Sequence, residues 1–171
     1  MPPGRSAILL VWAPPAPDGV MSLGSAHATV YSPTADSSFA QMVAKIASEE
    51  GGVEVMQPFE VAARLKAAGI TPTLQPDGRE LENLAAALGC DSYMTGVVHE
   101  WWYSYTFFWT KAVVSFELYG RVPGRYGPIW TVKADYVRKG IGAGDTAALA
   151  LTDAFRKLAA QGLVPGKKKT D

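Results

Sequence analysis

Residues 111–122 read Lys-Ala-Val-Val-Ser-Phe-Glu-Leu-Tyr-Gly-Arg-Val, and residues 129–138 read Ile-Trp-Thr-Val-Lys-Ala-Asp-Tyr-Val-Arg. Apolar and polar side chains alternate along both stretches, and successive side chains of a β-strand point to opposite faces. The apolar sides carry Ala112, Val114, Phe116, Leu118, Trp130, Val132, Ala134 and Tyr136, and the polar sides carry Lys111, Ser115, Glu117, Arg121, Thr131, Lys133 and Asp135. With the Pro- and Gly-rich turn 123–128 between them, the two stretches predict an antiparallel pair with one covered and one solvent-facing side.

A strand before this pair and a helix after it complete the second half of the chain. Residues 91–103 are apolar on both sides at their start and predict a third strand of the same meander. We expect Asp145 to cap the final helix and Gly162 to end it. The apolar stripe that would cover the meander consists of Ala148, Leu151, Phe155 and Leu158.

The first half of the chain predicts shorter elements. Residues 7–12 form an apolar run followed by prolines, which is typical of a central strand. Residues 18–35 predict a long loop with a short strand at 27–31, and residues 53–56 predict another short strand. The run at 7–12 also has a faint likeness to a secretion signal, but neither a small-residue cleavage site nor a lipid-accepting cysteine follows it. A buried strand is therefore the preferred interpretation.

Three helices are expected among these strands, because apolar residues recur at helical spacing between capping and stop residues. Their expected boundaries are Asp36 or Ser37 to Gly51-Gly52, Pro58 to Gly69, and Asp77 to Gly89, with Asp77 and Glu80 spaced as a capping box. Their expected buried stripes are Phe39, Met42, Val43 and Ile46, then Val61, Ala62 and Leu65, then Leu81, Leu84, Ala85 and Leu88.

Together these elements predict an α/β fold of the α+β type. The sheet is expected to be mixed, with the antiparallel meander in its second half and the helices mainly on one face. We expect one domain over residues 1–171, with its core at about 6–162 and a flexible basic tail at 163–171.

Composition excludes several classes of function. Sixteen basic residues balance sixteen acidic ones, whereas a nucleic-acid binder would normally carry a basic excess. The single cysteine, Cys90, cannot form a disulfide within the chain, and we expect it to be a buried structural thiol. His99-Glu100 begins like the zinc motif H-E-x-x-H, but Tyr103 stands at its fifth position. We therefore expect neither a metal nor a cofactor, and no enzymatic activity.

A glycine-rich loop provides the main alternative. Residues 140–144 read Gly-Ile-Gly-Ala-Gly and lie between a strand and a helix, where phosphate-binding loops occur. The lysine and the glycine order of the known nucleotide-binding motifs are absent. Residues Gly142, Gly144, Asp145 and Thr146 form a possible anion loop, and a small-ligand binder or enzyme would use it with His99.

The unusual feature is a crowd of aromatic residues at the expected hairpin tip. It comprises Trp101, Trp102, Tyr103, Tyr105, Phe107, Phe108 and Trp109. One strand cannot bury Trp101 and Trp102 on the same face, so part of this surface must be covered by another segment, a partner or lipid. The alternative is a second small core in which Trp101 and Tyr103 stack on the opposite strand. The aromatic tip is our candidate site for protein contacts.

Residues 84–98, Leu-Ala-Ala-Ala-Leu-Gly-Cys-Asp-Ser-Tyr-Met-Thr-Gly-Val-Val, resemble a helix-to-strand passage of bacterial envelope proteins. The relatives in question are lipoproteins of the curli-secretion type and the amino-terminal domain of TolB. The resemblance covers the element order over about residues 6–162, although no lipid-accepting cysteine is present and the aromatic tip is not part of the pattern. It implies a non-enzymatic module facing the periplasm or outer membrane. Its partners would be other envelope proteins or copies of itself, with membrane association if a lipidated precursor exists.

Overall fold

The computed structural model describes residues 6–12, 22–24, 27–31, 35–73, 76–106, 110–140 and 142–167. Its elements are, in order, β1 (Ser6–Trp12), β2 (Ser22–Gly24), β3 (His27–Tyr31), α1 (Ala35–Glu49), β4 (Val55–Met56), α2 (Pro58–Ala67), α3 (Gly78–Leu88), β5 (Ser92–Thr106), β6 (Thr110–Arg121), β7 (Trp130–Lys139) and α4 (Ala143–Ala160). The α+β class, with an antiparallel meander in the second half of the chain, is confirmed.

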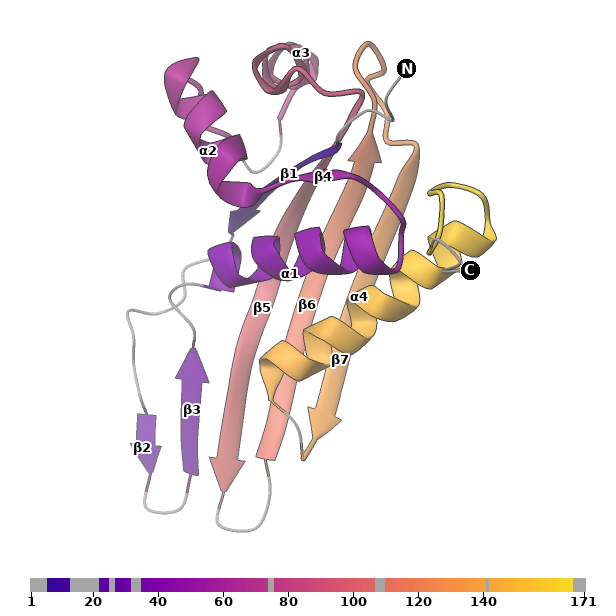
Figure 1. The fold of residues 1–171 in the computed structure, drawn as a ribbon. Helices are drawn as coiled ribbons and strands as arrows, with labels where there is room; N and C mark the ends of the chain where they lie inside the picture. The colour runs from indigo at the N-terminus through magenta and orange to yellow at the C-terminus, as the bar shows by residue number, and fades with distance from the viewer. Residues whose placement is uncertain are drawn as a thin grey trace.

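All seven described strands belong to one mixed sheet built around β5 (Figure 1). One edge of β5 pairs with β6 along its length, and β6 pairs in turn with β7, both antiparallel. The other edge of β5 is divided between two partners. Its first half, residues 92–98, runs parallel to β1, and its second half, residues 102–106, runs antiparallel to β3. The register toward β6 shifts between Val98 and Glu100, so His99 is the extra residue of a β-bulge.

The two longest helices, α1 and α4, cover one face of the sheet (Figure 1). Phe39 and Val43 of α1 and Leu151 and Phe155 of α4 are each 0% exposed. They pack on the covered side of the meander, which contributes Met94, Val98, Trp101, Ala112, Val114, Phe116, Leu118, Trp130 and Ala134. The face expected from alternation along 111–122 is thus the buried face.

A second, smaller core lies where α2 and α3 meet the start of β5. Tyr93 belongs to this core and Met94 to the first one, and neighbouring strand residues point to opposite faces. The helices α2 and α3 therefore pack on the face opposite α1 and α4, at one end of the sheet. The capping box of α3 forms as expected, with Asp77 accepting from the Glu80 amide at 2.8 Å and Gly89 ending the helix at φ 58°.

Four local expectations need correction. The helix α1 begins at Ala35, so Asp36 and Ser37 lie within its first turn, and Ala62 of α2 is exposed because only Val61 and Leu65 face the second core. The cap of α4 is Gly142 and makes no side-chain cap bond, which places Asp145 inside the first turn. Residues 163–166, expected to be flexible, pack back on the molecule, with the Gly166 amide donating to the Gly51 carbonyl at 2.8 Å.

Candidate functional site

The aromatic residues near the hairpin divide between the two faces of β5. Trp101 is 8% exposed and lies edge-on to Phe39, with ring centroids 5.7 Å apart. Trp101 therefore belongs to the main core and exposes little of its side chain. The side chains of Tyr103 and Tyr105, and residues Phe107, Phe108 and Trp109, lie outside the described part of the structure.

Trp102 is on the opposite, uncovered face of the meander and is half-buried. The strand register places Trp102 beside Val113, and Val113 beside Val137. Val137 is 61% exposed, whereas Val113 is 7% exposed. The Lys111 ammonium lies 5.7 Å from the centroid of the Trp102 ring, a cation–π distance. We call these four residues, Trp102, Lys111, Val113 and Val137, the Trp102 patch.

A polar cluster centred on Glu117 lies farther along the same face. The Glu117 carboxylate accepts from Lys133 Nζ at 2.8 Å and from the Tyr119 hydroxyl, and it lies 3.8 Å from His99 Nε2. The Lys133 bond, followed by the Tyr119 bond, holds the pKa of Glu117 below its ordinary 4.5. The same carboxylate raises the pKa of Tyr119 above 10.0 and that of Lys133 above 10.5.

These shifts stabilise the charged carboxylate and ammonium at neutral pH. A general acid or base for neutral pH needs the opposite tuning, which brings its pKa toward the working pH. The geometry therefore describes an ion pair on a protein surface. Among the described residues, no three His, Cys, Asp or Glu side chains are grouped so that they could hold a metal ion.

We expect Glu117→Gln to lower the free energy of unfolding by an amount that is largest near neutral pH and smaller at both acid and alkaline pH. A depressed carboxyl pKa adds stability above the unfolded value, near 4.5, and that stability is lost as the pH falls through the lower folded pKa. A raised tyrosine pKa adds stability below about 10, and that stability is lost as the pH rises through the folded pKa. Urea midpoints of the two proteins should therefore differ most between about pH 5 and pH 9.

Tyr119→Phe is the matched comparison for this profile. This variant keeps the Lys133–Glu117 pair, so the stability that the pair contributes should still be lost at acid pH. The stability lost at alkaline pH should be smaller than in the wild type, because the Tyr119 hydroxyl is absent. A difference between wild type and Glu117→Gln that is constant from pH 3 to pH 11 would contradict the cluster as described.

The described residues of the possible anion loop lie at the start of α4. The Thr146 hydroxyl is buried and donates to the Gly142 carbonyl at 2.9 Å, and the Thr146 amide bonds the same carbonyl. Asp145 is exposed in the first turn of α4, where its charge opposes a bound anion. Gly142 is exposed and Gly144 half-buried, and His99 contacts Glu117 on the face away from α4. The structure thus does not bring His99 to this loop.

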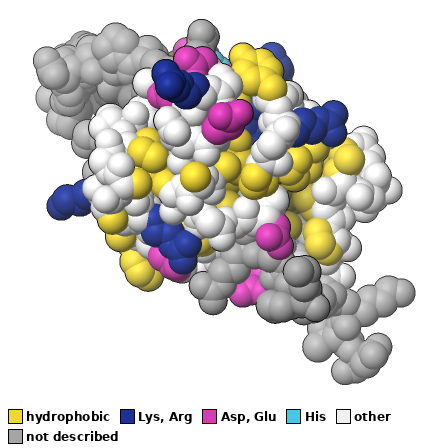
Figure 2. Space-filling view, turned by 90° about the horizontal axis from the view of Figure 1, so that it is seen from above, with side chains coloured by type: hydrophobic (Ala, Val, Ile, Leu, Met, Phe, Trp, Pro, Cys, Tyr) yellow, Lys and Arg dark blue, Asp and Glu magenta, His cyan; other side chains and the backbone are white. Residues whose placement is uncertain are grey.

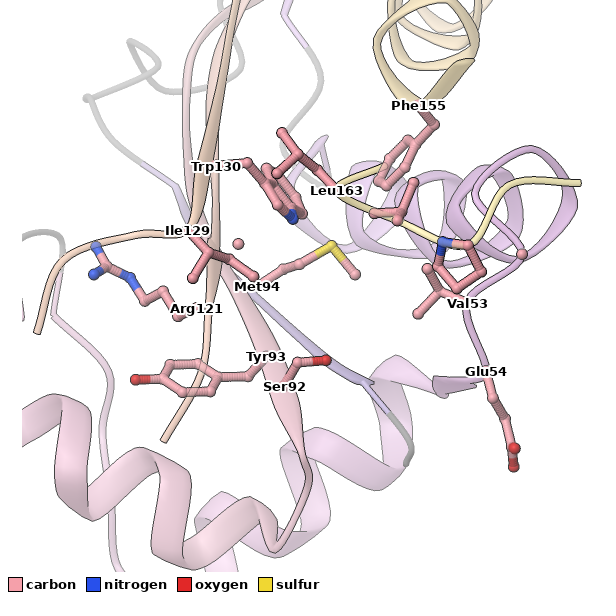
Figure 3. Close-up of a pocket in the computed structure, with 14 residues that line it drawn as sticks. Val53, Glu54, Ser92, Tyr93, Met94, Arg121, Ile129, Trp130, Phe155 and Leu163 are labelled. Carbon is pink, nitrogen blue, oxygen red and sulfur yellow. The ribbon is translucent and has the colours of Figure 1, made fainter. Parts of the chain in front are cut away.

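An apolar pocket of about 280 Å³ lies at the end of the sheet where β5 begins and β6 ends (Figure 3). The sequence does not predict this pocket, because the segment after α4 that forms one wall has the composition of a tail. The lining residues come from six segments and are Gly52, Val53, Glu54, Ser92, Tyr93, Met94, Gly120, Arg121, Ile129, Trp130, Phe155, Leu163, Val164 and Pro165. The only signal in the sequence was the apolar pair Leu163-Val164 beyond the helix stop.

Comparison with known proteins identifies the fold and no family. No protein-family model matches the chain, and no curated protein matches its sequence significantly. Lipoprotein GNA1162 from Neisseria meningitidis superposes with a TM-score of 0.60 and 16% identity over 91% of this chain and 99% of that one. The PelC dodecamer from Paraburkholderia phytofirmans superposes with a TM-score of 0.56 and 15% sequence identity. The match covers 90% of this chain and 86% of that one. The resemblance is therefore to the fold of these proteins, and not specifically to curli-secretion lipoproteins or TolB. Among the described helices, none has the length and hydropathy needed to cross a bilayer.

Proposed function

We propose that this protein is a non-enzymatic assembly module of the bacterial cell envelope. It acts through protein–protein contacts of the uncovered sheet face at the Trp102 patch, with a second copy of the chain as the partner. The observation that carries the proposal is the placement of Trp102 and Val137 on a face that none of the described helices covers at that end.

The chemistry of this face suits an identical partner. The Trp102 patch is apolar at its centre, while Asp135 and, farther along the same face, Lys133 carry opposite charges and are exposed. A surface with both signs can complement itself across a two-fold axis, and a net charge of zero leaves little repulsion between copies. Tryptophan within an apolar centre surrounded by polar groups is the usual arrangement of an interface hot spot.

The fold comparisons support the same proposal. One solved structure of this fold is a lipoprotein and another is a dodecamer. We carry the envelope location and self-association from those proteins to this chain as part of the proposal. Because Asp145 places a negative charge at the Gly142–Thr146 segment and His99 lies beside Glu117 instead, we do not advance the small-ligand alternative at that loop.

Light scattering coupled to size exclusion tests the proposal on the full chain. We expect the wild type to be oligomeric and Trp102→Ser to be a folded monomer, because serine removes the apolar centre of the patch. Phe59→Ser is the matched control, since Phe59 is 77% exposed on α2, away from the patch, and its loss should leave the oligomer intact. Far-ultraviolet circular dichroism verifies that both variants fold.

A monomeric wild type would overturn self-assembly through this face. Equal loss of the oligomer in Trp102→Ser and Phe59→Ser would place the interface elsewhere. If the wild type is monomeric but a purified envelope protein binds it and not Trp102→Ser, the patch serves a different partner and the choice of a second copy is wrong.

A further inference from the structure

We infer that the second copy packs on the uncovered sheet face with its strands antiparallel to those of the first, so that the acidic side chains of each copy face the lysines of the other. This orientation rests on the proposed function. It adds to that function the way in which the partner lies and the charged residues that select it. The observation behind it is the strand register, which sorts the side chains of this face into rows.

Three rows of side chains cross β5, β6 and β7 where the Trp102 patch lies. An apolar row is in the middle, a basic row lies toward the end of β5, and an acidic row lies on the other side. In that order, the rows consist of Trp102, Val113 and Val137; of Lys111 and Lys139; and of Glu100, Ser115 and Asp135. Their neighbours along the strands, among them Trp101, Val114 and Ala134, belong to the main core. Because successive side chains alternate, the rows are on the opposite, uncovered face.

The separation of charge between the rows is unfavourable in a single copy. Lys111 and Lys139 are directly opposite each other on β6 and β7, and like charges in this position destabilise a sheet. Glu100 and Asp135 are both exposed on either side of Ser115. At the other end of the molecule, basic and acidic side chains are interspersed instead (Figure 2). A partner that brings carboxylates to the lysines and lysines to the carboxylates would offset this separation.

A second copy does so in one of two symmetric orientations. Two sheets that pack face to face in the aligned manner keep their strand directions within about 30° of each other. With the two-fold axis along the strands, each row faces the same row of the partner, so lysines would face lysines. With the axis along the apolar row, the strands of the two copies run antiparallel and each basic row faces an acidic row. Like charges that face each other oppose association, which selects the second orientation.

The antiparallel orientation makes specific contacts. The apolar row faces the apolar row of the partner, and Asp135 faces the partner's Lys139, a contact that the symmetry repeats. Packed sheets are about 10 Å apart, a distance that an aspartate and a lysine side chain span together. The Ser115 hydroxyl donates to Asp135 Oδ1 at 2.5 Å and so holds this carboxylate on the contact face.

Charge exchange on β7 tests the orientation in the full chain. Asp135→Lys and Lys139→Asp each turn both contacts into like-charge contacts, so each should weaken self-association about tenfold or more in analytical ultracentrifugation. The double variant Asp135→Lys, Lys139→Asp restores opposite charges and should associate within about threefold of the wild type. Lys45→Asp is the matched control, because Lys45 is exposed on α1, on the other side of the sheet, and we expect no change.

Failure of the orientation and failure of the proposed function give different results. If association requires Trp102 but both single variants associate like the wild type, the interface is correct and the antiparallel orientation is wrong. Single variants that dissociate without recovery in a folded double variant would also overturn the orientation. A monomeric wild type overturns the proposed function, and the orientation with it.

Zero-length cross-linking of the unaltered chain is an independent measurement. Asp135 and Lys139 are about 13 Å apart along β7, beyond the combined reach of their side chains, so a carbodiimide can join them only between two copies. We expect peptide mass spectrometry to detect this amide in the wild type and not in Trp102→Ser. The Lys157–Asp153 pair on α4, at 2.8 Å, should be joined in both proteins and verifies the reagent. An oligomer that shows the control link without the Asp135–Lys139 link would exclude the orientation.

Discussion

Gly120→Ala is expected to lower the free energy of unfolding by about 3 kcal/mol, although the change adds a single methyl group. The added Cβ would lie 2.0 Å from Trp130 Cε2 and 2.2 Å from Nε1, closer than any real contact. Gly120 pairs with Trp130 across β6 and β7, and the indole also meets the buried ring of Phe155 edge-on. The indole cannot retreat without displacing the core, so the strain falls on the sheet.

Urea denaturation followed by circular dichroism measures this effect, and Gly127→Ala is its control. Gly127 lies in the turn between the same two strands, and a Cβ there meets nothing within 4 Å. We expect the midpoint of the control to remain close to that of the wild type. If both variants denature at the wild-type midpoint, the indole does not rest on Gly120.

Phe39→Ala is expected to cost about 3–5 kcal/mol, the range for removing a buried phenylalanine. Phe39 is 0% exposed, and its ring lies 4.7 Å from Phe116 and 5.7 Å from Trp101 between centroids. It joins α1 to both β5 and β6, so truncation leaves a cavity at the centre of the main core. Thermal and urea unfolding should both register the loss.

Phe59→Ala provides the comparison for this substitution, because the same side chain is removed from a position that is 77% exposed. Its effect should stay within about 0.5 kcal/mol, as for most surface changes. A loss at Phe59 comparable to that at Phe39 would mean that the covered face of the sheet has been wrongly assigned.

The features predicted well from the sequence are those whose determinants are local. Strict alternation identified the buried face of β6, and the capping box with Gly89 identified both ends of α3. These patterns act over a few residues, so they need no knowledge of distant partners. Ala62 shows the limit, because it satisfies the helical spacing of α2 yet faces solvent. Which residues of a helical stripe are covered depends on the elements packed against it.

The candidate sites depend on tertiary contacts and were predicted only in part. Because neighbouring side chains of a strand alternate, Trp101 and Trp102 had to point to opposite faces of the sheet. The sequence did not show that Trp101 would contact Phe39 of α1. The pocket could not be predicted from the sequence, because its walls come from segments far apart in the chain. Likewise, nothing near residue 163 indicates that Gly51 will accept a bond from Gly166.

Because one edge of β5 is divided between β1 and β3, the β2–β3 pair can separate from the sheet independently of β1. The parallel pairing with β1 ends at Val98, the antiparallel pairing with β3 begins at Trp102, and the bulge at His99 lies between them. Hydrogen bonds to β3 can therefore break without straining those to β1, and the β2–β3 pair can open as a unit. Amide protons of the β3 ladder should exchange with solvent together, and faster than those of the β1 ladder. Amide protons of the β1 ladder should exchange only when the core opens. The two halves of the continuous strand β5 would then differ in the free energy of opening.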